Sequence, residues 1–117
     1  MPRVNIYDMS FVKVYELLIA KALRKNRTKE EVYTVTSWLT GYSSDDIDKC
    51  MTSDISYGDF FLKAPCLNEN RVKITGTICG VRIEEIEEPL MKEIRYLDKL
   101  VDELAKGKSL DKILRKW

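Results

Sequence analysis

The stretch PLMKEIRYLDKLVDELAK, residues 89–106, decides the fold of this chain. Its apolar side chains recur in steps of four, three, four and three residues, which places on one helix face Leu90, Ile94, Leu97, Val101 and Leu104. Glu87 and Glu88 suit the start of such a helix, Pro89 suits its first turn, and Gly107 suits its end. We therefore predict a long amphipathic helix that packs across the other helices of the chain.

Shorter helices are predicted on both sides of this stretch. Ser10 suits a helix N-cap, and the apolar face of the helix that follows is formed by Phe11, Val14, Tyr15, Leu18 and Ala22. Thr28 and Glu31 have the spacing of a capping box, so a second helix begins there, and Gly41 ends it. Further short helices are expected after serine caps at residues 43–44, 56 and 109.

The segment that precedes the long helix, residues 72–86, is compatible with two structures. It is rich in β-branched residues that partly alternate, which favours a strand or a small hairpin that turns near Cys79 and Gly80. A short helix that ends at Gly80 fits about as well. The sequence therefore leaves the choice between strand and helix open.

Chain length and composition predict a mainly α, compact, single-domain helical fold over residues 1–117, with the segment 72–86 as its candidate β element. The chain has 117 residues, and most domains have about 100–150. Its composition of 44% hydrophobic and 33% charged residues is that of an ordinary globular protein. A chain of this size buries enough surface to fold without a metal or disulfide.

Several function classes are excluded or disfavoured by composition. The chain has 20 basic and 19 acidic residues, and this balance disfavours nucleic acid or an anionic membrane as a partner. It contains no histidine, which excludes serine–histidine and cysteine–histidine nucleophile pairs within the chain. Three widely spaced cysteines form neither a disulfide framework nor a zinc pattern, so we expect reduced thiols, no metal and no cofactor.

The chain shows no targeting or membrane signal. Its first residues, MPRVNIYDMS, lack the apolar core of a signal peptide, and its longest apolar run, Leu17 to Ala20, is far too short to span a bilayer. We therefore predict a cytoplasmic protein that has no membrane partner.

Four residues of the stretch KITGTICGVRIEEIEEP, residues 73–89, are the candidate binding residues: Gly76, Cys79, Gly80 and Arg82. The glycine pair could hold an anion, and the arginine could lower the pKa of the thiol. The spacing is one residue too short for a P-loop, however, and the P-loop lysine is absent. Turn geometry is the better explanation of the glycines, and burial is the better explanation of the cysteine.

Two other patterns favour structural readings. Residues 28–52 resemble a helix-turn-helix, but the second helix begins SSDDIDK, and its aspartates would repel phosphates. Arg95, Asp98, Lys99 and Asp102 form the polar flank of the long helix, where surface ion pairing is the commonest role. The apolar stripe of residues 90–104 is also a candidate surface for self-association.

The chain resembles a known family in the segments MSFVKVYELLIAKALRKNRTKEEV, WLTGY, FFLKAP and ITGTICGVRIEEIEEPLMKEIRYLDKLVDELAKGKSLDKIL. This small prokaryotic family is catalogued as domain of unknown function number twenty-two hundred. The resemblance implies a compact cytoplasmic protein of bacterial type. It implies no catalytic or binding residues, because the family has none assigned.

Taken together, the sequence favours a non-catalytic interaction or ligand-binding module. The alternative is an enzyme or a cofactor-assisted protein that uses Cys79, Arg82 and nearby carboxylates. Nucleic-acid binding is a weaker alternative. The partner, the ligand and the biological process are not specified by the sequence.

Overall fold

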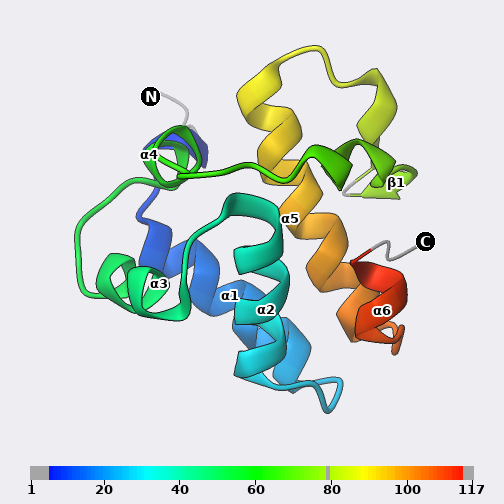
Figure 1. Ribbon diagram of the computed structural model, residues 1–117, viewed down its shortest axis with the longest axis horizontal. Coiled ribbons are helices and arrows are strands. Elements are labelled where there is room, and N and C mark those ends of the chain that lie inside the picture. Colours follow the sequence, from blue (N-terminus) through cyan, green and yellow to red (C-terminus); the bar gives the residue numbers. More distant parts are fainter. Residues whose placement is uncertain (1–5, 79, 115–117) are drawn as a thin grey trace.

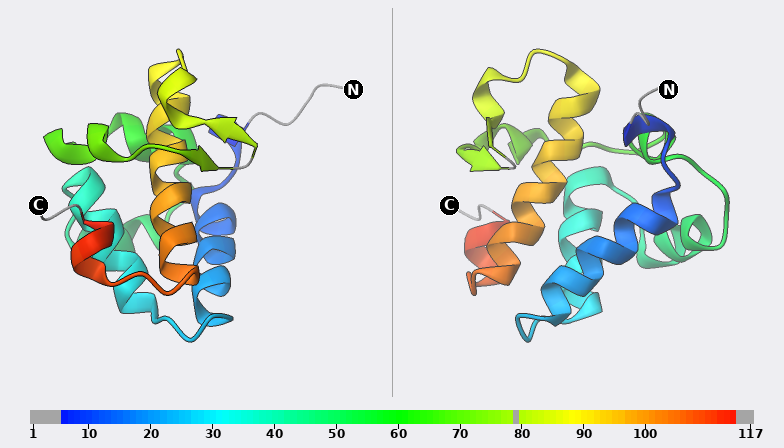
Figure 2. Two further views of the ribbon diagram at one scale, coloured as in Figure 1. Left: turned by 90° about the vertical axis from the view of Figure 1, so that its right-hand side faces the viewer. Right: turned by 180° about the vertical axis from the view of Figure 1, so that it is seen from behind.

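The long C-terminal helix α5, Pro89–Ala105, is the central element of the fold. The computed structural model describes residues 6–78 and 80–114 (Figure 1). Helices α1, Phe11–Leu23, and α2, Lys29–Thr40, both pack against α5. Seen from behind, α1 and α5 run side by side along the molecule (Figure 2). The mainly α fold predicted from the sequence is confirmed.

Burial of α5 confirms the predicted apolar stripe. Ile94, Leu97, Val101 and Leu104 have no exposed surface, and Leu100 is equally buried, whereas Leu90 at the amino end is half-buried. Because the chain's own helices cover this stripe, self-association through it would require those helices to separate. Each of these side chains contributes about 1.5–3 kcal/mol through removal from water, so α5 holds much of the core together.

Of two predicted helix caps, one forms as expected and the other does not. The capping box at the start of α2 is confirmed, because the Thr28 hydroxyl accepts a hydrogen bond from the Glu31 amide at 3.1 Å and the Glu31 carboxylate accepts one from the Thr28 amide at 3.0 Å. Ser10 stands at the N-cap position of α1 but makes no side-chain capping bond. Its backbone instead forms a bridge with Ser56, which ties the start of α1 to the start of α4.

The middle of the chain forms short capped helices. Helix α3, Ser44–Met51, begins with a capping box between Ser43 and Asp46, and α4, Tyr57–Leu62, begins with a bond from the Asp59 amide to the Ser56 hydroxyl. The aromatic residues of α4 enter the core. The ring centroids of Phe60 and Phe11 lie 4.1 Å apart in a stacked arrangement. The short helix expected after Ser56 is therefore confirmed, and its aromatic side chains are part of the core.

Residues 72–86 resolve into a small hairpin with flanking 3-10 turns. Strand β1, Thr77–Ile78, pairs antiparallel with β2, Val81–Arg82, so that Thr77 lies opposite Arg82 and Ile78 opposite Val81. The flanking 3-10 turns are η2, Glu69–Lys73, and η3, Ile83–Glu85, and a further 3-10 turn, η1, Ile6–Asp8, precedes α1. The hairpin alternative is confirmed, although its strands have only two residues each. The fold ends with α6, Leu110–Ile113, which packs against α5.

Membrane-spanning helices are absent from the part of the chain that the structure describes. Each helix there is too short or too polar to cross a bilayer.

The end of α2 generates a test of close packing. Gly41 has a φ of 84°, and a Cβ added there would stand 2.8 Å from the backbone nitrogen and oxygen of Cys66. Gly80 has a similar φ of 77° but open space around it. Gly80→Ala should therefore cost only the left-handed strain of about 1–2 kcal/mol, and Gly41→Ala should cost clearly more. Urea unfolding of both variants measures the difference. Equal losses would show that the Cys66 segment moves aside freely.

Candidate functional site

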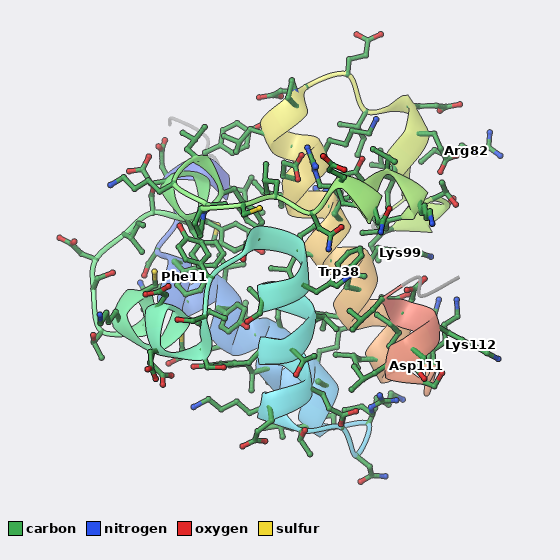
Figure 3. All side chains as sticks on the ribbon, viewed as in Figure 1. Phe11, Trp38, Arg82, Lys99, Asp111 and Lys112 are labelled. Carbon is green, nitrogen blue, oxygen red and sulfur yellow. The ribbon has the colours of Figure 1, made fainter. Side chains whose placement is uncertain are left out.

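The residues predicted as a binding site lie on the β1–β2 hairpin. Gly76 precedes β1, Gly80 follows it, and Arg82 ends β2. Cys79 lies outside the described residues, so the predicted thiol site is not placed. Figure 3 shows Arg82 and Lys99 on the same side of the molecule, beside this hairpin.

Polar groups of the hairpin bind glutamates of the segment that follows it. The Gly76 amide donates a hydrogen bond to the Glu84 carboxylate, and this bond lowers the pKa of Glu84 below its usual value. Arg82 is largely exposed, and its guanidinium lies 3.7 Å from the Glu85 carboxylate. Lys99 donates to the Thr77 carbonyl at 3.2 Å. The amide that an anion would need is therefore already bonded within the chain, and the anion site stays a prediction.

A groove of about 490 Å³ lies at the amino end of α5, away from the hairpin turn. The segment after α4 passes in front of α5 in Figure 1, and the groove lies between that segment, the end of α4 and the first turn of α5. Its walls are mostly apolar, and it is lined by Phe61, Leu62, Leu67, Arg71, Glu88, Pro89, Leu90 and Glu93. Leu90 belongs to the stripe predicted for self-association, and none of the lining residues was among the candidate binding residues.

The basic group of the groove is held in place by two partners. The Arg71 Nε donates to both carboxylate oxygens of Glu93, at 3.0 and 3.1 Å, and the Arg71 Nη1 donates to the Asn68 carbonyl at 2.8 Å. The side chain of Arg71 is 24% exposed and that of Glu93 is 14% exposed. This partly buried pair joins the segment after α4 to α5 and gives the groove one fixed wall.

The second acidic group of the groove is Glu88, at the N-cap position of α5. Its carboxylate accepts a hydrogen bond from the Tyr7 hydroxyl. Burial, followed by this bond and the negative charge of Glu88, raises the pKa of Tyr7 to about 12. The phenol is therefore neutral at physiological pH, so this hydrogen bond places no positive charge beside Glu88.

The predicted polar flank of α5 is divided between two faces. Arg95 binds Asp98 at 2.9 Å, and Asp102 binds Lys21 of α1 at 3.1 Å, whereas Lys99 turns toward the hairpin. Burial raises the pKa of Asp98 above its usual value, and the bond from Arg95 opposes this rise. Beside this pair, the Tyr57 hydroxyl is fully buried and makes no hydrogen bond within the described part of the chain.

The remaining predicted chemistry has structural explanations. Asp46 completes a cap, and Asp48 accepts a hydrogen bond from the Tyr33 hydroxyl at 2.6 Å, so these two aspartates of α3 serve the fold. Within residues 6–78 and 80–114, no cluster of three or more metal-ligating side chains occurs. Cys50 is half-buried, and burial raises the pKa of its thiol, which makes it a poor nucleophile.

The fold and the groove define a small helical domain with a surface groove at the amino end of its central helix. The chain belongs to a family described as "Uncharacterized protein conserved in bacteria (DUF2200)", whose model matches residues 5–115. The crystal structure of uncharacterized protein SP1917 is similar to this structure, with a TM-score of 0.92 and 56% sequence identity over 96% of this chain and 92% of that chain. Among curated proteins, none matches this chain. The family resemblance is confirmed, and neither match specifies an activity.

The groove could not be recognised in the sequence, because the residues that line it come from segments far apart in the chain. Leu62 and Leu67 were the available signal, since both are apolar residues in or next to a polar connection. Their association with Glu88 and Leu90 follows only from the crossing of this connection over α5.

The energetic role of the Tyr57 hydroxyl can be measured by comparison with another buried tyrosine, Tyr42. The Tyr42 hydroxyl donates to the Phe60 carbonyl at 2.7 Å, so Tyr42→Phe should lower the free energy of unfolding by about 1 kcal/mol. Tyr57→Phe removes an unbonded hydroxyl and should leave the stability unchanged or raise it. Urea unfolding of both variants checks this difference. A loss at Tyr57 as large as that at Tyr42 would mean that the Tyr57 hydroxyl is bonded in solution.

Asp98 should give stability a characteristic pH dependence. Its folded-state pKa lies above its unfolded value, so its carboxylate destabilises the fold at neutral pH, and this penalty disappears as the pH falls below the unfolded value. Asp98→Asn does not titrate at this position. The free energy of unfolding of the natural chain minus that of Asp98→Asn should therefore fall as the pH rises from about 3 to 7. Unfolding curves across this range measure it, and an increase with pH would contradict the burial argument.

Proposed function

We propose that this protein is a non-catalytic ligand-binding module that takes an apolar group into the groove at the amino end of α5. The groove itself carries the proposal. Its volume of about 490 Å³ falls within the range of about 300–1,000 Å³ typical of small-molecule sites, and its apolar walls carry a few fixed polar groups.

The position of the groove supports a preformed site. One wall is the first turn of α5, whose later turns are anchored in the core. The opposite wall is fixed by the Arg71–Glu93 pair and by a bond from the Asn68 amide to the Leu39 carbonyl at 3.0 Å. While the segment after α4 holds this closed position, a ligand needs little further ordering of the groove, and low ordering cost favours affinity.

The exposure of Leu62 supplies a driving force. This side chain lines the groove and is 69% exposed to solvent. A ligand that covers it would remove apolar surface from water, which is the main favourable term in most small-molecule sites.

The composition and the thiols support a place for this module in the cytoplasm. Cys50 and Cys66 are free thiols, as expected for a reducing compartment. The acidic first turn of α3 disfavours nucleic acid as the ligand.

A neutral apolar probe tests the proposal. In a heteronuclear NMR titration, 4-phenylbutan-1-ol at millimolar concentration should shift the backbone amides of residues that line the groove in a saturable manner. Leu62→Ser should weaken this binding about fivefold, because it removes one apolar contact worth about 1 kcal/mol.

Leu17→Ser is the matched control. Leu17 is 67% exposed, nearly the same as Leu62, but it lies on α1 and does not line the groove. It should leave the affinity unchanged. Shifts scattered over the whole surface, or equal effects of the two serine variants, would reject the groove as the binding site.

A further inference from the structure

The charges of the groove do not cancel. Arg71 contributes one positive charge, which Glu93 neutralises through the bonds at 3.0 and 3.1 Å. Glu88 contributes a further negative charge, and its hydrogen-bond partner is the neutral Tyr7 phenol. The three ionised side chains that line the groove therefore sum to a charge of −1 beside mostly apolar walls.

No neighbouring cation pairs with Glu88 within the described residues. Lys92 lies four residues further along α5, at the spacing of a helical ion pair, yet no ion pair to Glu88 forms within 4.0 Å. Arg95, one turn beyond Lys92, forms its ion pair with Asp98. The amino end of α5 offsets part of the charge, since a helix dipole is equivalent to about half a positive charge there. The net charge of the side chains that line the groove is nonetheless negative within the described residues.

Tyr7 keeps the Glu88 carboxylate in place. Its hydroxyl binds one carboxylate oxygen, Oε1. The backbone of Tyr7 packs directly on α4 at Gly58, where an added Cβ would lie 3.0 Å from the Tyr7 Cβ and 3.1 Å from its carbonyl oxygen. Glu88 is thus linked through Tyr7 to α4, whose last residues form another wall of the groove. The second oxygen, Oε2, has no bond within the described residues.

We infer that the ligand of this groove is an organic ammonium cation with an apolar body, and that Glu88 is its counter-ion. This inference rests on the proposed function of the groove. The apolar body lies against Phe61, Leu62 and Leu67, and the ammonium group lies at the rim beside Glu88. A carboxylate ligand would be repelled by the same charge, and Arg71 cannot compensate because Glu93 already neutralises it.

Three probes with one apolar body separate the inference from the proposed function. We use 4-phenylbutylamine, which is a cation at neutral pH, 4-phenylbutan-1-ol and 4-phenylbutyrate, with NMR titrations at low salt. The amine should bind about fivefold more tightly than the alcohol, and the carboxylate more weakly than both. Because Glu88 is exposed, added salt should reduce the advantage of the amine toward unity.

Two variants locate the charge. Glu88→Gln keeps an oxygen that can accept the Tyr7 hydrogen bond but removes the charge, so the amine and the alcohol should then bind equally. Glu87→Gln removes a neighbouring exposed charge that does not line the groove, and it should preserve most of the preference. If Glu88→Gln does not fold, the effect of salt on amine binding to the natural chain tests the inference instead.

The outcomes are distinct. Equal binding of amine and alcohol at the groove, with no salt dependence, overturns the inference and leaves the proposed function intact. A preference that survives in Glu88→Gln overturns the assignment of the counter-ion. Failure of all three probes to bind at the groove overturns both the inference and the proposed function.

Discussion

The burial of α5 between α1 and α2 is the constraint on which the structure depends. Leu97, Leu100, Val101 and Leu104 have no exposed surface, and they belong to a single hydrophobic cluster. Their removal from water is worth several kcal/mol in total, which is comparable to the net stability of a domain of this size. Further elements contact this helix along its length: α4 near its amino end, the hairpin through Lys99, and α6 near its carboxyl end. The position of every candidate site therefore follows from the position of α5.

The parts of the fold that depend on local sequence were predictable. The stripe of α5 and the capping box of Thr28 and Glu31 follow from spacing alone, because both interactions join residues three or four apart in one helix. The side-chain cap expected at Ser10 does not form, because tertiary backbone contacts of this segment compete with local capping. The Phe11 amide donates to the Ile55 carbonyl at 3.0 Å, and the Tyr57 amide donates to the Met9 carbonyl at 2.8 Å. The start of α1 is thus fixed by the backbone of another segment.

The hydrogen-bond partners in the hairpin and in the groove could not be predicted, because they too depend on contacts between separate segments. The glycines of the hairpin were visible as a local pattern, but the Gly76 amide is used by Glu84, eight residues further along the chain. The groove depends on contacts of much longer range: Tyr7 reaches Glu88 across 81 residues, and Arg71 reaches Glu93 across 22. No periodicity or motif encodes such pairs. The sequence could supply only the residue types, namely leucines in a polar connection and carboxylates at a helix start.

The proposed binding in the groove would act on the least regular part of the described chain. Between α4 and β1, the described backbone contains a 3-10 turn but neither an α-helix nor a strand, and it is held to the rest by a few bonds such as that from the Cys66 amide to the Thr40 carbonyl at 3.1 Å. Segments of this kind open locally at a lower free energy than a core helix does. A ligand that contacts both Leu67 and Leu90 bridges this segment to α5, and binding to the closed form alone stabilises that form by mass action. The first turn of the central helix would then transmit occupancy of the groove to the segment that leads into the hairpin, because the Arg71–Glu93 pair already joins the two.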